Sequence, residues 1–271
     1  MTATNLCYLN GEILPYERAS LHVSDLQFQR GYGIFDFFRS RNGDIPWLED
    51  YEDRLFRSLE LADLEMPVDR TGFRSILSTL QEGNRLDNAG FKVLVTGGFS
   101  DNLAGVTGPP NLLILHRPWE KPPDSTFREG VALIRQAYVR PNPEIKSLYY
   151  FNTLALRGKL KAYDAVDVLF HDEFISEVSR ANLFFVKKDV IVTPDRNILK
   201  GITRKQVLGL VPEIRVEPVP VAELDGFEEI FLTSTGRDVT PVVRVEGRPV
   251  GDGRPGPVTR DIMRLFREQG W

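Results

Sequence analysis

Hydrophobic positions recur along the chain with different spacings, and each spacing predicts a different kind of element. Leu48, Tyr51, Leu55, Leu59 and Ala62 return every three or four positions within residues 48–64, which is the spacing of an amphipathic helix. The same kind of pattern predicts helices at residues 73–83, 151–162, 201–211 and 257–270. Short apolar runs predict strands at residues 91–98, 111–117, 131–139 and 228–236, several short strands within 165–194, and a hairpin at 242–251.

Turn-forming residues divide these segments. Asn10 and Gly11 separate two short apolar runs, and this dipeptide is typical of a hairpin because both residues accept positive φ. Prolines and charges are densest at residues 117–130, which is typical of a linker. We therefore predict a small N-terminal α+β domain, a linker and a larger C-terminal α+β domain, at residues 1–120, 121–125 and 126–271. Strand-rich and helical segments lie apart, which favours the α+β class over a doubly wound sheet.

Composition narrows the kinds of partner that the protein takes. A net charge of −4 argues against a nucleic-acid partner, which requires an excess of basic residues. The single cysteine, Cys7, has no partner for an internal disulfide, and the first residues lack the features of a signal peptide. No apolar run is long enough to cross a bilayer, so we expect a cytoplasmic location. The three histidines show no metal-ligand spacing, and no metal is expected.

Lys146 is the first candidate for chemistry. It stands between a proline-broken loop and the aromatic run "LYYF", just before the predicted helix at 151–162. A lysine in apolar surroundings loses ionic solvation, so its neutral amine becomes available for Schiff-base formation. A surface lysine whose stem packs on apolar residues is the alternative.

Two segments suit the binding of a phosphate group. In "LKGITRKQV" a glycine precedes a helix, and the amides of Ile202 and Thr203 are then open to an anion, unless Thr203 only caps the helix. In "FLTSTG" a strand ends on Thr233, Ser234 and Thr235, followed by a glycine whose backbone can approach a ligand closely. An ordinary turn is the alternative for this second segment.

Two charged residues add to this set. Arg54 lies at the edge of the apolar stripe of the predicted helix at 48–64, where its guanidinium can hold a phosphate in two bonds, or else pair with Asp50. Glu177 lies between apolar strand residues, and a buried acid facing a pyridine nitrogen keeps that nitrogen protonated. An exposed strand glutamate is the alternative for Glu177.

Taken in order, these segments resemble the class IV aminotransferases, which are pyridoxal-phosphate enzymes of fold type IV. The family includes branched-chain aminotransferases, D-amino-acid transaminases and aminodeoxychorismate lyases. The resemblance runs over nearly the whole chain and rests on the motifs "RGYGIFDFFR", "LEDYEDRLFRS", "IKSLYY", "ISEVSRANLFFVKKDVIVTP", "LKGITRKQV", "FLTSTGRDVTPV" and "GPVTRDI".

The resemblance implies a role for each candidate residue. Lys146 matches the catalytic lysine that forms the Schiff base with pyridoxal 5'-phosphate and then moves the substrate proton. Glu177 matches the acid at the pyridine nitrogen, and Tyr150 the tyrosine near the phenolic oxygen. The residues that bind the cofactor phosphate in this family correspond here to Arg54, Ile202, Thr203, Ser234 and Thr235. The resemblance also implies a two-domain architecture of fold type IV, with the cofactor between the domains, and a homodimer whose loops complete each other's sites.

The departures from the family pattern concern the substrate. Arg180 stands in "EVSRAN" where branched-chain enzymes have a glycine, and Arg30 takes the place of their aromatic residue. The sequence has Gly97 where many D-amino-acid transaminases have a carboxylate-binding arginine. We therefore expect a relocated carboxylate trap. Its candidate cations are Arg30, Lys92, Arg180 and Arg237.

Simpler explanations exist for two of these cations. For Arg180 it is a salt bridge to Asp172, Glu173 or another loop acid, and for Arg30 it is a surface contact. Arginine suits the trap because its planar fork holds a carboxylate in two bonds.

The sequence thus predicts a ping-pong transaminase that moves an amino group between a D-amino acid, such as D-glutamate or D-alanine, and a 2-oxo acid such as 2-oxoglutarate. The chain also resembles a group of D-amino-acid transaminases with "RGYGIFDYF"-like and "SARSN"-like motifs, and this resemblance favours D-substrates. The alternatives are a branched-chain L-amino-acid aminotransferase, an aminodeoxychorismate lyase and a non-catalytic homologue that kept the fold.

Overall fold

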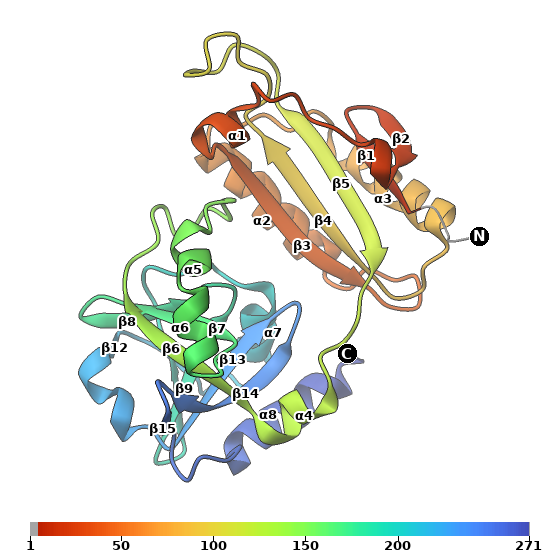
Figure 1. The fold of residues 1–271 in the computed structure, drawn as a ribbon. Helices are drawn as coiled ribbons and strands as arrows, with labels where there is room; N and C mark the ends of the chain where they lie inside the picture. Colours follow the sequence, from red (N-terminus) through yellow and green to blue (C-terminus); the bar gives the residue numbers. More distant parts are fainter. Residues whose placement is uncertain (1–4, 271) are drawn as a thin grey trace. The chain divides into compact units, whose positions relative to one another are not determined.

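The computed structural model describes residues 5–270, and the chain forms two compact units within them (Figure 1). The first unit consists of the described residues up to Glu120 together with Ile145–Tyr149. The second unit consists of Lys121–Glu144 and the chain from Tyr150 onward. Each unit is built on a sheet of its own.

The first unit is an antiparallel sheet with helices on one face (Figure 1). Its strands are β1 (Leu6–Leu9), β2 (Glu12–Pro15), β3 (Gly33–Ser40), β4 (Ala89–Thr96) and β5 (Asn111–Pro118), in the order β2-β1-β5-β4-β3. Its helices are α1 (Leu26–Arg30), α2 (Leu48–Leu61) and α3 (Arg70–Asn84), and a 3-10 turn, η1, covers Tyr16–Arg18.

Side-chain alternation explains how this sheet faces its helices. In β3 the residues Ile34 and Phe38 are buried, whereas Phe35 and Phe37 on the opposite face stay partly exposed. The apolar stripe of α2 packs on the buried face, so that Phe38 lies 5.4 Å from the Tyr51 ring. The side chains of α2 that face the sheet therefore lie against β3.

The segment Ile145–Tyr149 adds to the free edge of β3. Phe35 N–H donates to the carbonyl of Lys146 at 2.9 Å, and Leu148 N–H donates to Gly33 at 3.1 Å. Ile34 and Ser147 form an antiparallel bridge between these two bonds. Lys146 is therefore held in extended backbone against β3, five residues before the next helix begins.

The second unit is built on a mixed sheet of parallel and antiparallel strands. Its strands are β6 (Val131–Ala137), β7 (Asp167–His171), β8 (Phe174–Val178), β9 (Asn182–Lys187), β10 (Val190–Thr193), β11 (Arg215–Val216), β12 (Val219–Pro220), β13 (Glu229–Ser234), β14 (Asp238–Val245) and β15 (Arg248–Pro249). Its helices are α4 (Asp124–Glu129), α5 (Phe151–Ala155), α6 (Arg157–Ala162), α7 (Ile202–Leu210) and α8 (Pro257–Glu268), and a 3-10 segment, η2, covers Val221–Gly226.

The sheet order of the second unit is β11-β10-β9-β13-β14-β6-β7-β8-β12, with β15 beside β14. Leu183, Phe185, Ile230 and Leu232 form part of the core on one face of this sheet. Phe184 and Phe231 point to the other face and stack at 4.7 Å. Alternation along β9 and β13 thus gives the sheet an apolar layer on both sides.

Most of the predicted elements are confirmed. Asn10 and Gly11 have φ of 47° and 101° and join β1 to β2 as a hairpin. The helix predicted at 73–83 passes through Gly83 and ends at Asn84, because Arg85 adopts the left-handed conformation that closes it. The single helix predicted at 151–162 is wrong in detail, since the chain breaks it at Leu156 into α5 and α6.

The predicted mixed α and β class is confirmed, whereas the predicted domain boundaries stay a prediction. α4 begins at Asp124, inside the stretch predicted as a linker at 121–125. Ile145–Tyr149, which the prediction includes in the C-terminal domain, belongs to the first unit by its contacts. Within the described residues, no helix is long and apolar enough to cross a membrane.

Candidate active site

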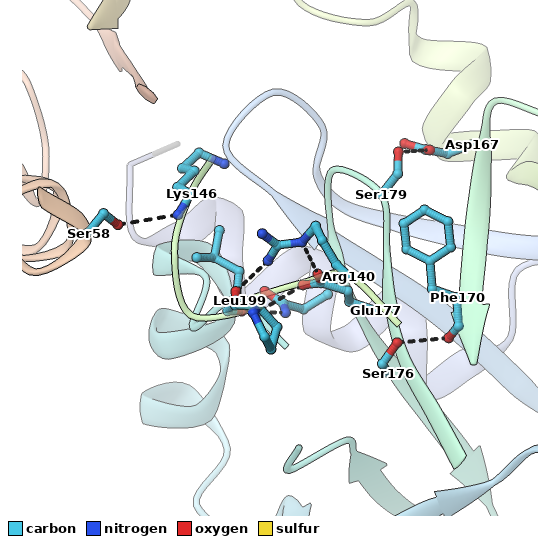
Figure 2. A network of polar contacts seen from close by, with 11 residues as sticks. Ser58, Arg140, Lys146, Asp167, Phe170, Ser176, Glu177, Ser179 and Leu199 are labelled. Atoms are coloured by element: carbon cyan, nitrogen blue, oxygen red, sulfur yellow. Dashed lines mark hydrogen bonds and ion pairs between the residues drawn. The ribbon is translucent and has the colours of Figure 1, made fainter. Parts of the chain in front are cut away.

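Lys146 is fixed through its backbone and through an aromatic neighbour. Its N–H donates to Ser58 Oγ of α2 at 3.3 Å, as Figure 2 shows, and its carbonyl accepts from Phe35. Its Nζ lies 4.6 Å from the centroid of the Phe35 ring. The lysine is half-buried, so both the stem and the ammonium lie beside apolar surface.

Arg54 lies on α2 one turn before Ser58 and points to β3. Its Nε and Nη2 donate to the two oxygens of Asp36 at 2.9 and 2.6 Å, and the Asp36 carboxylate is fully buried. The side chain of Arg54 is 10% exposed. This two-bond pair fixes the plane of the guanidinium in the first unit.

The other two predicted cations of the first unit lie at its surface. Arg30 ends α1, is exposed and donates from Nη1 to Gln29 O at 2.9 Å. Lys92 is exposed on β4, and its Nζ lies 5.4 Å from the Phe35 ring that Lys146 also contacts. Lys92 and Lys146 are therefore both placed around one aromatic side chain.

Glu177 is a buried acid on β8, which rules out the exposed strand glutamate considered from the sequence. Its residue is 4% exposed, and its Oε1 accepts from Arg140 Nε at 2.8 Å. Its Oε2 accepts from Leu199 N–H at 2.7 Å (Figure 2). Arg140 Nη2 also donates to Pro143 O. Both oxygens of the carboxylate are thus held by donors of the second unit.

Tyr150 is electrostatically coupled to the same set of charges. Burial raises the pKa of the Tyr150 hydroxyl to about 12. The Arg140 guanidinium lowers this pKa, and the negative charges of Glu177 and Asp167 raise it by smaller amounts. The hydroxyl therefore keeps its proton at neutral pH and is able to donate a hydrogen bond. The second unit thus brings Tyr150 together with Glu177 and Arg140.

Asp167 binds one of the two predicted cations of the second unit and lies close to the other. Arg180 Nε donates to Asp167 Oδ2 at 3.0 Å, and Arg237 Nη1 lies 3.9 Å from the same oxygen. Ser179 Oγ donates to Asp167 Oδ1, which Figure 2 shows. The salt bridge considered for Arg180 therefore forms, but its acid is Asp167 and not Asp172 or Glu173.

The N-terminus of α7 presents backbone donors beside β9. Its N-cap is Gly201, not Thr203, and no side chain caps this helix end. Asn182 Nδ2 donates to Leu199 O at 2.8 Å, and a Cβ on Gly201 would lie 2.1 Å from Asn182 Oδ1. The buried Arg204 donates to Thr193 Oγ1 at 3.2 Å and anchors the first turn. The amide end of α7 is therefore held by hydrogen bonds to β9 and β10 and has no acid in its first turn.

The hydroxyl residues of β13 lie next to this helix end. Thr233 pairs across the sheet with Asn182, so the two side chains share a face. Among the described residues, the buried hydroxyl of Thr233 has no hydrogen-bond partner. Ser234, the last residue of β13, and Thr235, the first of the turn that follows, are half-buried, and Arg237 N–H donates to Ser234 O at 3.2 Å.

Four residues that hold the candidates were not predicted from the sequence. Arg140, Asp167, Asp36 and Ser58 each bind a predicted site residue. Asp36 and Asp167 carried a usable signal, because each is a lone acid between apolar residues of a strand. Arg140 and Ser58 carried no such signal, since their partners are distant in sequence.

Known proteins resemble this chain over nearly its full length. The family model described as amino-transferase class IV matches residues 33–245. Branched-chain-amino-acid aminotransferase-like protein 1 of Arabidopsis thaliana is 31% identical over 97% of this chain, which spans about half (50%) of that relative. D-alanine aminotransferase of Bacillus licheniformis is 28% identical, with 95% of this chain and 94% of the relative covered.

A solved structure shows the same fold. The branched-chain amino acid aminotransferase of Escherichia coli superposes with a TM-score of 0.88 at 24% identity, over 98% of this chain and 94% of that one. The predicted fold type and the family resemblance are confirmed by these matches. The chain belongs to the class IV aminotransferases, the family of pyridoxal-phosphate-dependent enzymes of fold type IV.

Proposed function

We propose that the protein is a D-amino-acid transaminase that uses pyridoxal 5'-phosphate and passes the amino group to a 2-oxo acid such as 2-oxoglutarate in a ping-pong cycle. D-Glutamate and D-alanine are the proposed donors. Membership of the class IV family supports the aminotransferase activity. The relatives include proteins named as D-alanine aminotransferases and proteins named as branched-chain-amino-acid aminotransferases. The choice between these substrates rests on the charged residues described above.

The donor set of the second unit fits the cofactor. The uncapped end of α7 offers the amides of Ile202 and Thr203 to a phosphate, and the unpartnered Thr233 hydroxyl lies on the same side of the sheet. Glu177 would accept a hydrogen bond from the protonated pyridine nitrogen and so keep it protonated, and Tyr150 would donate to the phenolic oxygen. Ser234 and Thr235 complete the part of the proposed phosphate cradle that the second unit supplies, and Arg54 is the candidate phosphate ligand of the first unit.

The bound cofactor supplies an electron sink that labilises the α-proton of an amino acid. Lys146 would link to it covalently and, once released, carry that proton on one fixed side of the substrate. The pairing with β3 and the contact of the N–H with Ser58 fix the backbone of Lys146, and its amine lies beside the Phe35 ring. The side of the α-carbon that faces Lys146 then depends on where the carboxylate is held.

The observation that carries the D-substrate proposal is the pair of arginines at Asp167. Arg180 and Arg237 place two guanidinium groups at the one carboxylate of Asp167, and Arg180 and Asp167 are both electrostatically coupled to Tyr150, so this part of the second unit is polar and cationic. A pocket for a branched aliphatic side chain would favour apolar residues instead. We propose that Arg180 binds the substrate carboxylate, with Arg30, Lys92 and Arg237 as the other candidate cations.

We also propose a homodimer. Val23, Phe28, Phe99, Leu103 and Val106 are exposed apolar residues of the turn before α1, of α1 itself and of the β4–β5 loop. Asp25 bridges Phe99, so these two segments lie side by side in the first unit. Arg30 ends α1 beside this apolar surface, and a second copy packed on it would bring Arg30 to the partner's site.

An L-branched-chain aminotransferase is the second candidate function, and the names of several relatives favour it. An aminodeoxychorismate lyase would release pyruvate without an amino acceptor, so product analysis separates it from either transaminase. A non-catalytic homologue would not take up the cofactor and would stay colourless.

The test is the absorbance spectrum of the purified, cofactor-loaded protein before and after separate addition of D-glutamate, D-alanine, L-glutamate and L-leucine. Loss of the cofactor's visible band with the D-amino acids alone is the expected result. A response to L-leucine or L-glutamate alone would replace the proposal by the branched-chain function. An unchanged spectrum with all four would exclude both transaminase proposals.

A further inference from the structure

Asp167 is a fully buried acid at the first position of β7, and its carboxylate meets donors from two directions. Oδ1 accepts from the N–H of Val168 at 2.8 Å and from the hydroxyl of Ser179. Oδ2 accepts from Arg180 Nε at 3.0 Å and lies 3.9 Å from Arg237 Nη1. The backbone and Ser179 therefore fix the carboxylate, and the fixed carboxylate in turn faces two arginines.

The contacts of Arg180 use only one edge of its guanidinium. Nε donates to Asp167, and Nη2 on the same edge donates to the carbonyl of Val166 at 3.1 Å. Among the described residues, no hydrogen bond is found for Nη1 of Arg180, and the side chain is 53% exposed. The terminal edge, made of Nη1 and the second Nη2 hydrogen, remains able to bind a carboxylate in two bonds.

The charges of this cluster leave an excess of one positive charge. Two guanidinium groups, those of Arg180 and Arg237, share the single carboxylate of Asp167. Arg237 is the more enclosed of the two, and its pKa is lowered by burial first, while Asp167 raises it and Arg180 lowers it. One added carboxylate would therefore neutralise the cluster, whereas an apolar ligand would leave the charge unbalanced.

We infer that Asp167 is a positioning residue for substrate recognition: it holds the Nε edge of Arg180 and thereby presents the terminal edge to the substrate carboxylate. This inference rests on the proposed function, in which Arg180 is a substrate ligand. It adds a residue of opposite charge to the site. A mere counter-ion would have the reverse effect, because removing its negative charge would strengthen the binding of an anion.

These two roles of Asp167 predict opposite changes in KM. With Asp167→Asn, the side chain keeps its shape but loses the charge that holds Arg180. If Asp167 positions Arg180, KM for 2-oxoglutarate rises about tenfold and kcat changes much less, because the lost interaction is one of binding geometry. If Asp167 is only a counter-ion, KM falls. Glu173→Gln, which removes an exposed acid from the neighbouring turn, is the matched control and leaves KM unchanged.

A double-mutant cycle with Arg180→Ala separates the inference from the proposed function. The four forms are the wild type, the two single variants and the double variant, each assayed as the cofactor-loaded enzyme with D-alanine as the donor and 2-oxoglutarate as the acceptor. If Asp167 acts through Arg180, the double variant has the same KM as Arg180→Ala alone. A separate effect of Asp167→Asn in the Arg180→Ala background would overturn the inference.

Two further outcomes are informative. Unchanged KM in Arg180→Ala would refute Arg180 as a substrate ligand and would remove the proposed trap itself, whatever Asp167→Asn does. Unchanged or lowered KM in Asp167→Asn, with KM raised in Arg180→Ala, would overturn only the positioning role. If Asp167→Asn does not fold, Ser179→Ala keeps every charge but removes one of the two donors to Asp167 Oδ1, leaving only the Val168 N–H. It should raise KM about threefold, and no rise would count against the inference.

Discussion

The pair of Arg140 and Glu177 allows a quantitative test of how burial sets the strength of an ion pair. Their side chains are 11% and 5% exposed, and the charged atoms lie 2.8 Å apart. Removing one partner of a buried pair costs about 3–5 kcal/mol, because the other charge stays buried without compensation. Leu199 N–H still donates to Glu177 Oε2, so we expect the lower end for Arg140→Ala, about 3 kcal/mol of the free energy of unfolding.

The assay is urea denaturation of the cofactor-free protein, followed by circular dichroism at neutral pH. The matched control is Arg264→Ala, because Arg264 and Glu268 pair at nearly the same distance, 2.9 Å, but are 59% and 56% exposed. An exposed pair one helical turn apart contributes below about 0.5 kcal/mol. A loss of about 3 kcal/mol corresponds to roughly a hundredfold change in the ratio of folded to unfolded protein, well above the error of the extrapolation.

A second variant identifies the cause of the loss. In the Glu177→Gln background the uncompensated charge is absent, so the further loss from Arg140→Ala should shrink to about 1 kcal/mol, the worth of a neutral hydrogen bond. Equal losses for Arg140→Ala and Arg264→Ala would refute the reasoning from burial. An undiminished loss in the Glu177→Gln background would refute the unpaired charge as its cause.

Three further outcomes follow from the structure. Gly201→Ala should weaken binding of pyridoxal 5'-phosphate at least tenfold in an absorbance titration, because its Cβ would meet Asn182, whereas Gly209→Ala in the same helix has open space and should bind normally. Burial lowers the pKa of His116 from 6.5 to about 4, so the folded state disfavours the charged ring and loses roughly 3 kcal/mol as the pH falls through this range. His116→Gln should flatten that part of the stability curve measured by urea at several pH values. Phe28→Asp should shift the protein to a monomer in light scattering, and an unchanged mass would remove the apolar surface at Phe28 from the proposed dimer.

Local patterns predicted most of the elements because their causes lie within a few residues. The stripe of α2 and the Asn10-Gly11 turn depend only on side chains and φ preferences at those positions. The extended backbone of Lys146 has a different cause, since it pairs with β3, and its anchor Ser58 is 88 positions away. The helical spacing after residue 150 gave no indication of that pairing.

The same holds for the candidate site, where the sequence indicated which residue types take part but not which residues they contact. The residue types of Glu177, Arg54 and Arg180 indicated buried or bidentate interactions. Glu177 and Arg54 do make such interactions, whereas Arg180 is exposed and binds the Asp167 carboxylate through Nε alone. Their partners could not be chosen, because many acids and arginines were available and only the strand order selects among them. For Arg180 the acids weighed were those of the adjacent turn, whereas β7 brings Asp167 to it from within a strand.

The addition of Ile145–Tyr149 to β3 has a consequence for the synthesis of the chain. β3 is an edge strand of the first sheet, and the segment that covers it is made long after the other strands. Until residue 149 has left the ribosome, the nascent first unit carries a free edge, which is open to pairing with another chain. A fragment cut at Glu120 would keep this defect permanently, and the strand that it lacks is the one that contains Lys146.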